Sequence, residues 1–342
     1  MKNRIRLKSL SSLIVLLSII CSCEKNEDIL EMSNESFAKK SITKIDTDTS
    51  SPFINKETPY GGRASHTSVI FDDKMWVIAG INHDTTFNDV WSTKDGKNWD
   101  VMTKDGGFEE RYGHASTTTK TGMWIAGGMN GATFLNDVWY SKNGKEWIET
   151  IKNAPFSSRR WHTLTNLSGR MFLIGGFSGD VDAIKGDIWV SSDGVQWNQV
   201  TNLAPFGRRY GHATVVYDHK IWVIGGYDQN NNYLNDVWYS KNGFQWNLAT
   251  PNADFSIRRN HAVVANEKGM WLTGGIAAGH VYFDDIWFSN NGVNWVKVKT
   301  NKNFPSRGYH SSVYYDKKLW VLHGFKQNIN TPNDYYSDIW AY

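Results

Sequence analysis

Cysteine is nearly missing from this chain, which has two among 342 residues, Cys21 and Cys23. Everything after residue 23 is therefore expected to have no disulfide, no cysteine zinc site and no cysteine redox centre. Long apolar runs are missing as well, because the longest, Leu13–Ile20, is too short to span a membrane. The formal charge is only +3. We therefore look for function in the remaining, aromatic-rich part of the chain.

The first 23 residues are typical of a targeting segment. A positive stretch precedes the apolar run, and Ile20-Cys21-Ser22-Cys23 resembles a bacterial lipobox. We predict a lipoprotein signal peptide at residues 1–22 and lipidation of Cys23, with a plain secretory signal as the alternative. The resemblance implies a bacterial outer-membrane protein held by its lipid anchor alone. Cleavage would remove four cations, Lys2, Arg4, Arg6 and Lys8, and change the charge from +3 to −1, which argues against nucleic-acid binding.

Residues 23–49 read as a disordered tether, because polar residues dominate and no apolar period is present. The acidic cluster that follows Cys23 resembles the surface-export signal of Bacteroidetes lipoproteins. A solvated spacer is the alternative interpretation. The sequence therefore leaves open whether the protein faces the periplasm or the cell exterior.

The rest of the chain is an array of repeats. An Arg-x-x-His motif occurs six times, and successive histidines lie 48, 48, 50, 49 and 49 residues apart. From each histidine to the glycine that closes the next apolar run is always 14 residues. Such a period indicates one structural unit stacked against its copies.

Each unit reads as four antiparallel strands. In the first unit these are His66–Phe71, the buried run Met75–Gly80, Asp89–Ser92 and a strand that carries Trp99. Asp95-Gly96 and its counterparts favour a type I′ turn between the last two strands. Six four-stranded units predict a six-bladed β-propeller over residues 50–342.

These features resemble Kelch-repeat propellers over about residues 51–342. The resemblance rests on the double glycines, such as Gly127-Gly128, on the fourth-strand tryptophans and on the Arg before each first strand. It departs from the usual pattern at Ala79 and His323, which replace a glycine. The resemblance implies a protein-binding module, a sugar-acid mutarotase or a copper oxidase. The oxidase branch needs a cysteine that this domain lacks, so we expect no metal and no cofactor.

The ring must also close. The sixth unit ends inside its third strand, at Trp340-Ala341-Tyr342. The segment Pro59–Arg63 parallels the segments that precede later units, which places residues 50–56 at the missing fourth strand. We therefore predict that this N-terminal strand completes the last blade.

The face that carries the Arg segments and the variable loops is the candidate site. Its arginines would suit carboxylate or sulfate groups, unless they pair with the third-strand aspartates Asp89, Asp137, Asp187, Asp236, Asp285 and Asp338. The six histidines are expected to be packing residues. The predicted ligand-binding arginines are Arg63, Arg111, Arg159, Arg209, Arg258 and Arg307.

The two residues between Arg and His differ from unit to unit, which suggests a surface released from packing, with loop drift as the alternative. Aromatic rings beside cations there suit sugar rings or peptide side chains. The predicted ligand-binding residues of this kind, with two from the variable loops, are Tyr112, Arg160, Trp161, Tyr210, Arg259, Tyr309, Phe177 and Tyr227.

Two functions remain open. The first is a monomeric, non-catalytic binding module for a glycan or protein ligand. The second is a sugar-acid enzyme, a mutarotase or epimerase or a sialidase-like hydrolase, for which Glu109 and Glu110 are the best-placed carboxylates. The enzyme interpretation gains if unpaired arginines line a pocket beside an acid, and loses if all six motif arginines pair with aspartates.

Overall fold

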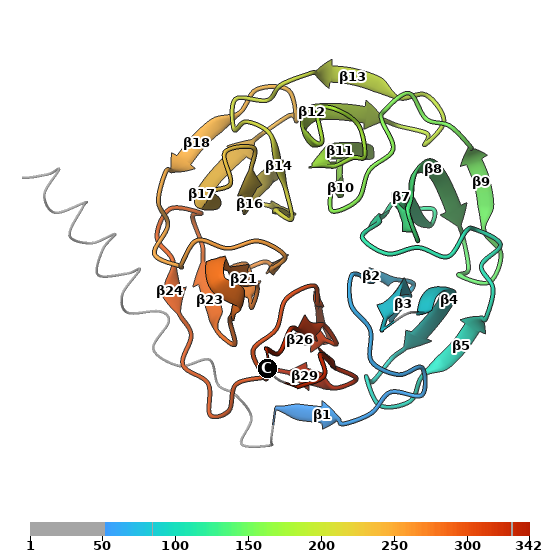
Figure 1. The fold of residues 1–342 in the computed structure, drawn as a ribbon, viewed down its shortest axis with the longest axis vertical. Helices are drawn as coiled ribbons and strands as arrows, with labels where there is room; N and C mark the ends of the chain where they lie inside the picture. The colour runs from blue at the N-terminus through green and yellow to red at the C-terminus, as the bar shows by residue number, and fades with distance from the viewer. Residues whose placement is uncertain (1–51, 84, 330) are drawn as a thin grey trace, which may run out of the picture. The chain divides into compact units, whose positions relative to one another are not determined.

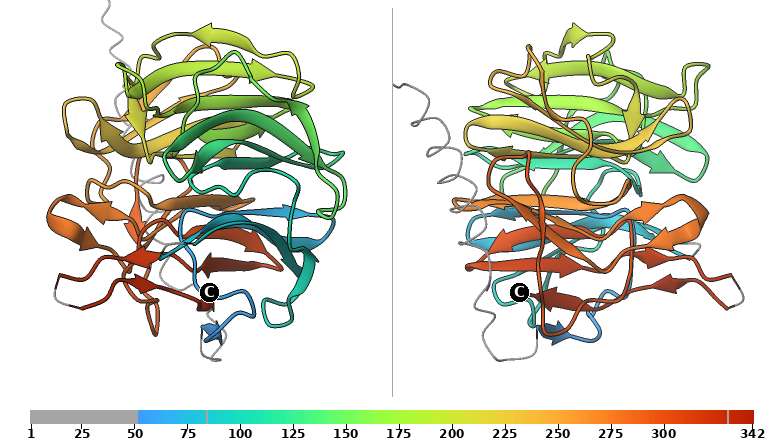
Figure 2. Two further views of the ribbon diagram at one scale, coloured as in Figure 1. Left: turned by 45° about the vertical axis from the view of Figure 1, so that its right-hand side comes forward. Right: turned by 90° about the vertical axis from the view of Figure 1, so that its left-hand side faces the viewer.

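The computed structural model describes residues 52–342 apart from 84 and 330. The predicted signal peptide, the tether and Cys23 lie outside these residues. Figure 1 shows the described part as a ring of six blades around a central channel, and Figure 2 shows the ring from the side, with strands running between two faces. The predicted six-bladed propeller is confirmed.

Each of the first three blades is one four-stranded antiparallel sheet, numbered from the channel outward. The strands of blade 1 are β2 (Thr67–Phe71), β3 (Lys74–Asn82), β4 (Thr85–Thr93) and β5 (Asp100–Thr103). Those of blade 2 are β6 (Ala115–Thr118), β7 (Met123–Asn130), β8 (Thr133–Ser141) and β9 (Ile148–Ile151). Those of blade 3 are β10 (Thr163–Leu167), β11 (Arg170–Phe177), β12 (Ile184–Ser191) and β13 (Asn198–Thr201).

The last three blades add short elements on the variable-loop face. Blade 4 has β14 (Arg209–Tyr210), β15 (Ala213–Tyr217), β16 (Lys220–Asp228), β17 (Tyr233–Ser240) and β18 (Asn247–Thr250). Blade 5 has β19 (Ala262–Asn266), β20 (Gly269–Thr273), β23 (Ile286–Ser289) and β24 (Val296–Lys297), with β21 (Ile276–Ala277), the 3-10 turn η1 (Ala278–His280) and β22 (Val281–Tyr282) above them. Blade 6 has β25 (Ser311–Tyr315), β26 (Lys318–Leu322), β29 (Ile339–Ala341) and β1 (Phe53–Asn55), with the small hairpin β27 (Phe325–Lys326) and β28 (Asp334–Tyr335).

The N-terminal strand closes the ring, as predicted. Strand β1 pairs antiparallel with β29, with Phe53 opposite Trp340 and Asn55 opposite Ile339. The rings of Phe53 and Trp340 lie 5.1 Å apart. Chain segments nearly 300 residues apart thus form one blade. Strand β1 lies within residues 50–56, the segment predicted to close the ring.

Two local predictions need correction. The third strand of blade 1 runs from Thr85 to Thr93, longer than the predicted Asp89–Ser92, because β3 and β4 continue pairing up to Asn82 and Thr85. The Asp95-Gly96 turn is not type I′, since only Gly96 has a positive φ, of 70°. The Asp95 carboxylate instead accepts hydrogen bonds from the amides of Lys97 and Asn98, which fixes the turn through its side chain.

Primed turns occur instead between the first and second strands. Asp72 and Asp73 have φ values of 48° and 52°, and the flanking Phe71 and Lys74 are paired. This turn lies on the face opposite the Arg segments. The variable-loop face is marked by bridges such as Ala64 to Ile81 and Tyr112 to Met129, which join each Arg segment to the loop of its own blade. The predicted placement of Arg segments and variable loops on one face is confirmed.

The double glycines let neighbouring blades approach closely at the channel. At Gly128, φ is 109°, and an added Cβ would lie 2.9 Å from Cβ of His114 in the same blade. At Gly127, φ is 59°, and an added Cβ would lie 2.9 Å from Cε1 of His162 in the next blade. Both the backbone conformation and the space therefore require glycine or a residue that tolerates positive φ. The motif histidines and glycines thus form one packed layer.

Candidate functional site

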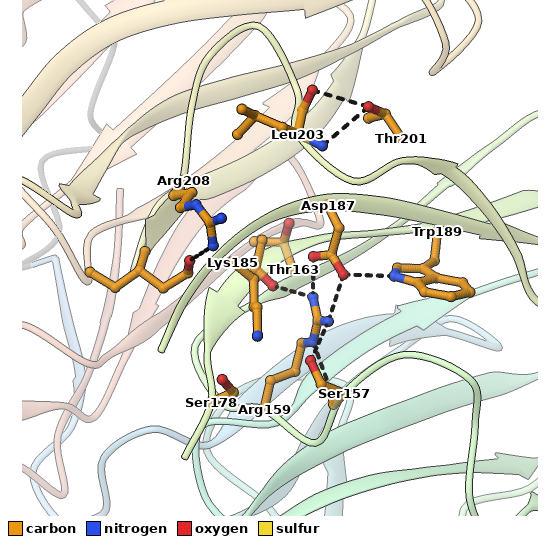
Figure 3. Close-up of polar contacts among 12 residues, drawn as sticks. Ser157, Arg159, Thr163, Ser178, Lys185, Asp187, Trp189, Thr201, Leu203 and Arg208 are labelled. Atoms are coloured by element: carbon orange, nitrogen blue, oxygen red, sulfur yellow. Dashed lines mark hydrogen bonds and ion pairs between the residues drawn. The ribbon is translucent and has the colours of Figure 1, made fainter. Parts of the chain in front are cut away.

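The six motif arginines are buried inside the blades. In blade 3, Arg159 has 0% exposure and donates from Nη1 and Nη2 to the two carboxylate oxygens of Asp187, at 2.6 and 2.8 Å. Asp187 also accepts a hydrogen bond from Nε1 of Trp189 at 2.8 Å (Figure 3). Arg159 donates a further hydrogen bond to the carbonyl of Gly175. Burial alone would raise the pKa of Asp187, but the hydrogen bonds and charge of Arg159 leave that pKa below its usual value.

The same pairing is found in every blade, so the prediction that these arginines bind a ligand is corrected. Each of these arginines is at most 1% exposed as a residue, and its guanidinium donates to an aspartate and to a backbone carbonyl. No surface remains for a ligand to contact. The alternative, pairing with the third-strand aspartates, is confirmed for Arg63–Asp89, Arg111–Asp137, Arg159–Asp187, Arg209–Asp236, Arg258–Asp285 and Arg307–Asp338.

The motif histidines are packing residues, as predicted. All six are buried, and several bond to a hydroxyl of the preceding blade, as His114 does to Thr67 at 2.9 Å. Burial, followed by the charge of Arg159, lowers the pKa of His162 to about 3. Such histidines are neutral at physiological pH and link the blades.

A closed ring of backbone hydrogen bonds joins the six blades where the channel meets the Arg face. It is formed by the residue before each motif histidine, and every one of these residues has a positive φ between 51° and 63°. Each amide donates to the equivalent carbonyl of the preceding blade at 2.7–3.0 Å, and the last blade connects to the first. We call this ring the collar; it consists of Ser65, Gly113, Trp161, Gly211, Asn260 and Tyr309.

The collar holds the predicted variable residues together. Blades 3 and 6 lie on opposite sides of the ring in Figure 1, yet the ring centroids of Trp161 from blade 3 and Tyr309 from blade 6 are 5.9 Å apart. Trp161 also stacks on Tyr210 at 5.6 Å. All eight predicted residues of this kind are thus linked in one cluster, which we call the mouth cluster: Tyr112, Arg160, Trp161, Phe177, Tyr210, Tyr227, Arg259 and Tyr309.

Two arginines within the mouth cluster lie against aromatic rings. Cζ of Arg160 is 3.8 Å from the Trp161 ring centroid, and its Nη1 donates to the hydroxyl of Tyr112 at 2.9 Å. Cζ of Arg259 is 5.2 Å from the Tyr210 centroid, and its Nη1 donates to the Tyr210 hydroxyl. Across residues 52–342, with 84 and 330 set aside, neither guanidinium has a carboxylate within 4.0 Å.

Three further residues belong to this site although they are not among the predicted ligand-binding residues. Phe134 lies against Arg160 at 5.6 Å, Tyr233 lies against Arg259 at 5.5 Å, and Asn260 is a collar residue. Phe134 and Tyr233 are the second and first residues of their third strands, just after the variable loops. An aromatic residue directly after a variable loop is therefore the sequence feature that could have identified Phe134 and Tyr233.

A family model for the KLHDC2/KLHL20/DRC7 Kelch-repeats domain matches residues 32–176 and 161–342, and so accounts for the whole propeller. The chain belongs to this Kelch-repeat family. The solved structure of YjhT is similar to the Kelch propeller with a TM-score of 0.65 and 17% identity, covering 83% of this chain and 95% of that chain. That likeness supports the fold only. No curated protein matches the chain.

The Kelch channel contains a cavity of about 240 Å³ that extends from the collar along the start of the inner strands. The motif histidines form one layer of its wall, and Ser68, Ser116, Thr214 and Ser312 contribute hydroxyls to another. Among the described residues there is no group of three or more His, Cys, Asp or Glu side chains that could hold a metal ion. No helix in this same part of the chain is long and apolar enough to cross a membrane.

The carboxylates considered for an enzyme are poorly placed. Glu109 and Glu110 are exposed, and Glu109 contacts Arg111 only through its backbone carbonyl, which accepts from Nε at 3.0 Å. All six motif arginines are paired with aspartates. The condition set for the enzyme interpretation is therefore not met by this Kelch propeller.

Proposed function

We propose that this protein is a lipid-anchored, surface or periplasm-facing Kelch propeller that binds a glycan or protein ligand at the mouth cluster without catalysing a reaction. The observation that carries the proposal is the gathering of six aromatic side chains and two arginines that have no carboxylate partner among the described residues, all on the variable-loop face. Aromatic rings and cations of this kind are enriched at binding hot spots.

The local packing explains why this face is suited to recognition. The collar fixes the backbone of Trp161 and Tyr309 through hydrogen bonds to both neighbouring blades. Bridges within a blade fix the backbone of Arg160 against Phe177. Contacts such as Arg160 on Trp161 and Trp161 on Tyr210 hold the side chains in place before a ligand arrives. A pre-ordered site loses less conformational entropy on binding.

The binding function is tested with a glycan array and a peptide library, using protein that lacks residues 1–22 and carries Cys23→Ser. We expect Trp161→Ala and Arg160→Ala each to weaken binding at least about 10-fold, as hot-spot truncations do. Arg170→Ala is the matched control, because Arg170 also lies over an aromatic ring, Phe244, but on the opposite face. Unchanged binding in both mouth variants would exclude the site.

The anchor is tested separately in the native host. If Cys23 is lipidated, labelled fatty acid is incorporated into the full-length protein and not into the Cys23→Ser variant, which leaves the membrane fraction. Protease added to intact cells then distinguishes surface exposure, which gives cleavage, from a periplasmic location, which gives protection. Equal labelling of both proteins would exclude lipidation at this residue.

A further inference from the structure

A tyrosine–arginine pair occurs twice in the mouth cluster. Tyr112 of blade 2 accepts a hydrogen bond from Arg160 of blade 3, 48 residues later. Tyr210 of blade 4 accepts the same bond from Arg259 of blade 5, 49 residues later. In both pairs the tyrosine precedes a collar glycine, and the arginine precedes a larger collar residue. The mouth therefore contains two copies of one arrangement.

Both copies present a largely buried cation without a counter-ion. Every motif arginine has its aspartate, whereas Arg160 and Arg259 have only phenol hydroxyls and aromatic faces among residues 52–342, with 84 and 330 excepted. Nε of each is buried without a hydrogen-bond partner. A cation removed from water without a carboxylate is costly, and an anionic group from outside would offset that cost.

Resting on the proposed binding function, we propose that Arg160 and Arg259 form two subsites that bind two acidic groups of a single acidic oligosaccharide. The carboxylate or sulfate groups of the sugar chain supply the two missing counter-ions, since guanidinium groups bind such anions through paired donors.

The spacing allows one short chain to reach both subsites. The distances from Cζ of Arg160 to Trp161, from Trp161 to Tyr210, and from Tyr210 to Cζ of Arg259 are 3.8, 5.6 and 5.2 Å. These steps limit the separation of the two cations to about 15 Å, so a second contact by the same ligand is intramolecular and gains from a high effective concentration.

A sugar chain fits the mouth better than an extended peptide. The collar amides and carbonyls bond to one another around the ring, so they offer no main-chain partners to a peptide strand. Arg259 is instead surrounded by phenols, those of Tyr210, Tyr227 and Tyr233, whose hydroxyls can donate to and accept from sugar hydroxyls. Burial raises the pKa of Tyr210, so this phenol stays protonated at neutral pH.

The test measures calorimetric affinities of the protein for galacturonic acid and for its oligomers of two, three and four residues. The methyl-esterified oligomers are the neutral controls, and tetraglutamate is the peptide control. We expect the best oligomer to bind at least about 10-fold more tightly than the monomer. Arg160→Gln and Arg259→Gln should each abolish that gain, while Arg170→Gln on the other face should keep it. Melting curves verify that the variants are folded.

A second measurement needs no variant. If two ion pairs form, the affinity of the wild-type protein for the best oligomer falls about twice as steeply with salt, on a logarithmic scale, as its affinity for the monomer. Equal affinities for monomer and oligomers, equal binding of the esterified chain, or a gain that survives Arg160→Gln would each overturn the two-subsite inference.

The outcomes also separate this inference from the general binding function. Tighter binding of tetraglutamate than of any oligogalacturonate would overturn the glycan assignment and leave a binding site at the mouth. Binding of only neutral glycans would overturn the acidic-group assignment and would likewise leave a binding site at the mouth. A failure to bind any member of the glycan array or the peptide library would instead reject the proposed function itself.

Discussion

Replacing Asp187 with asparagine removes the counter-ion of a buried arginine while keeping the shape of the side chain. Arg159 is fully buried and donates two hydrogen bonds to Asp187 at 2.6 and 2.8 Å, while the Asp187 side chain is 12% exposed. Because an uncompensated charge stays behind in a low-dielectric site, we expect Asp187→Asn to lower the free energy of unfolding by about 3–5 kcal/mol. This is a large fraction of the stability of an ordinary domain.

The assay is urea unfolding followed by tryptophan fluorescence, with Asp182→Asn as the control. Asp182 belongs to the same blade and lies 3.5 Å from Arg208, but its side chain is 71% exposed. That exposed pair should contribute less than about 1 kcal/mol. A loss below about 1 kcal/mol for Asp187→Asn would refute the assignment of the motif arginines to the scaffold, since a free guanidinium would not depend on this carboxylate.

Three other perturbations test the fold. Burial and neighbouring arginines lower the pKa values of His162, His261, His310 and His323 to about 3, well below that of an unfolded histidine. Below about pH 6.5 the unfolded chain therefore binds more protons than the native state, and the stability should fall as the pH falls toward 3. A flat melting temperature from pH 7 to pH 4 would contradict this. Gly128→Ala should lower the free energy of unfolding by at least about 2 kcal/mol, because φ is 109° and Cβ of His114 would lie 2.9 Å from the new carbon. Gly131→Ala, where nothing lies within 4 Å of the new carbon, should lower it by about 1 kcal/mol. Equal losses in the two variants would exclude the packing argument. Deleting residues 45–58 removes the strand that pairs with β29 and should lower the melting temperature markedly, so an unchanged melt would refute closure by this segment.

The period of the sequence predicted the architecture because each repeat must bury the same faces against its neighbours. The closing strand could be predicted in the same way, because Trp340-Ala341-Tyr342 lies in the third strand of the sixth repeat and β1 supplies the fourth strand of that blade. Turn types were less predictable. Asp95-Gly96 has the composition of a primed turn, but the Asp95 side chain caps two amides and changes the backbone conformation.

The role of the motif arginines could not be read from spacing. Arg159 contacts Asp187, 28 residues later, because two strand pairings bring the third strand of the blade back beside it. A different register of the third strand would have left the guanidinium without this carboxylate. The variable residues were more informative, because Arg160 and Trp161 occupy positions that differ from unit to unit between an arginine and a histidine that recur in all six units. Phe134, beside Arg160, and Tyr233, beside Arg259, could not be predicted from the motif because they lie at strand starts outside it.

Variation around the collar is coupled between neighbouring blades, which argues against simple loop drift. A Cβ on Gly113 would lie 3.0 Å from Cδ1 of Trp161, and a Cβ on Gly211 would lie 2.6 Å from Oδ1 of Asn260. Each collar glycine thus makes room for the larger residue that follows it in the ring. Because the backbone hydrogen bonds hold every collar position alike, side chains can change there without loosening the propeller, provided that a large residue keeps a small neighbour. Trp161 occupies the centre of the mouth because Gly113 stands beside it.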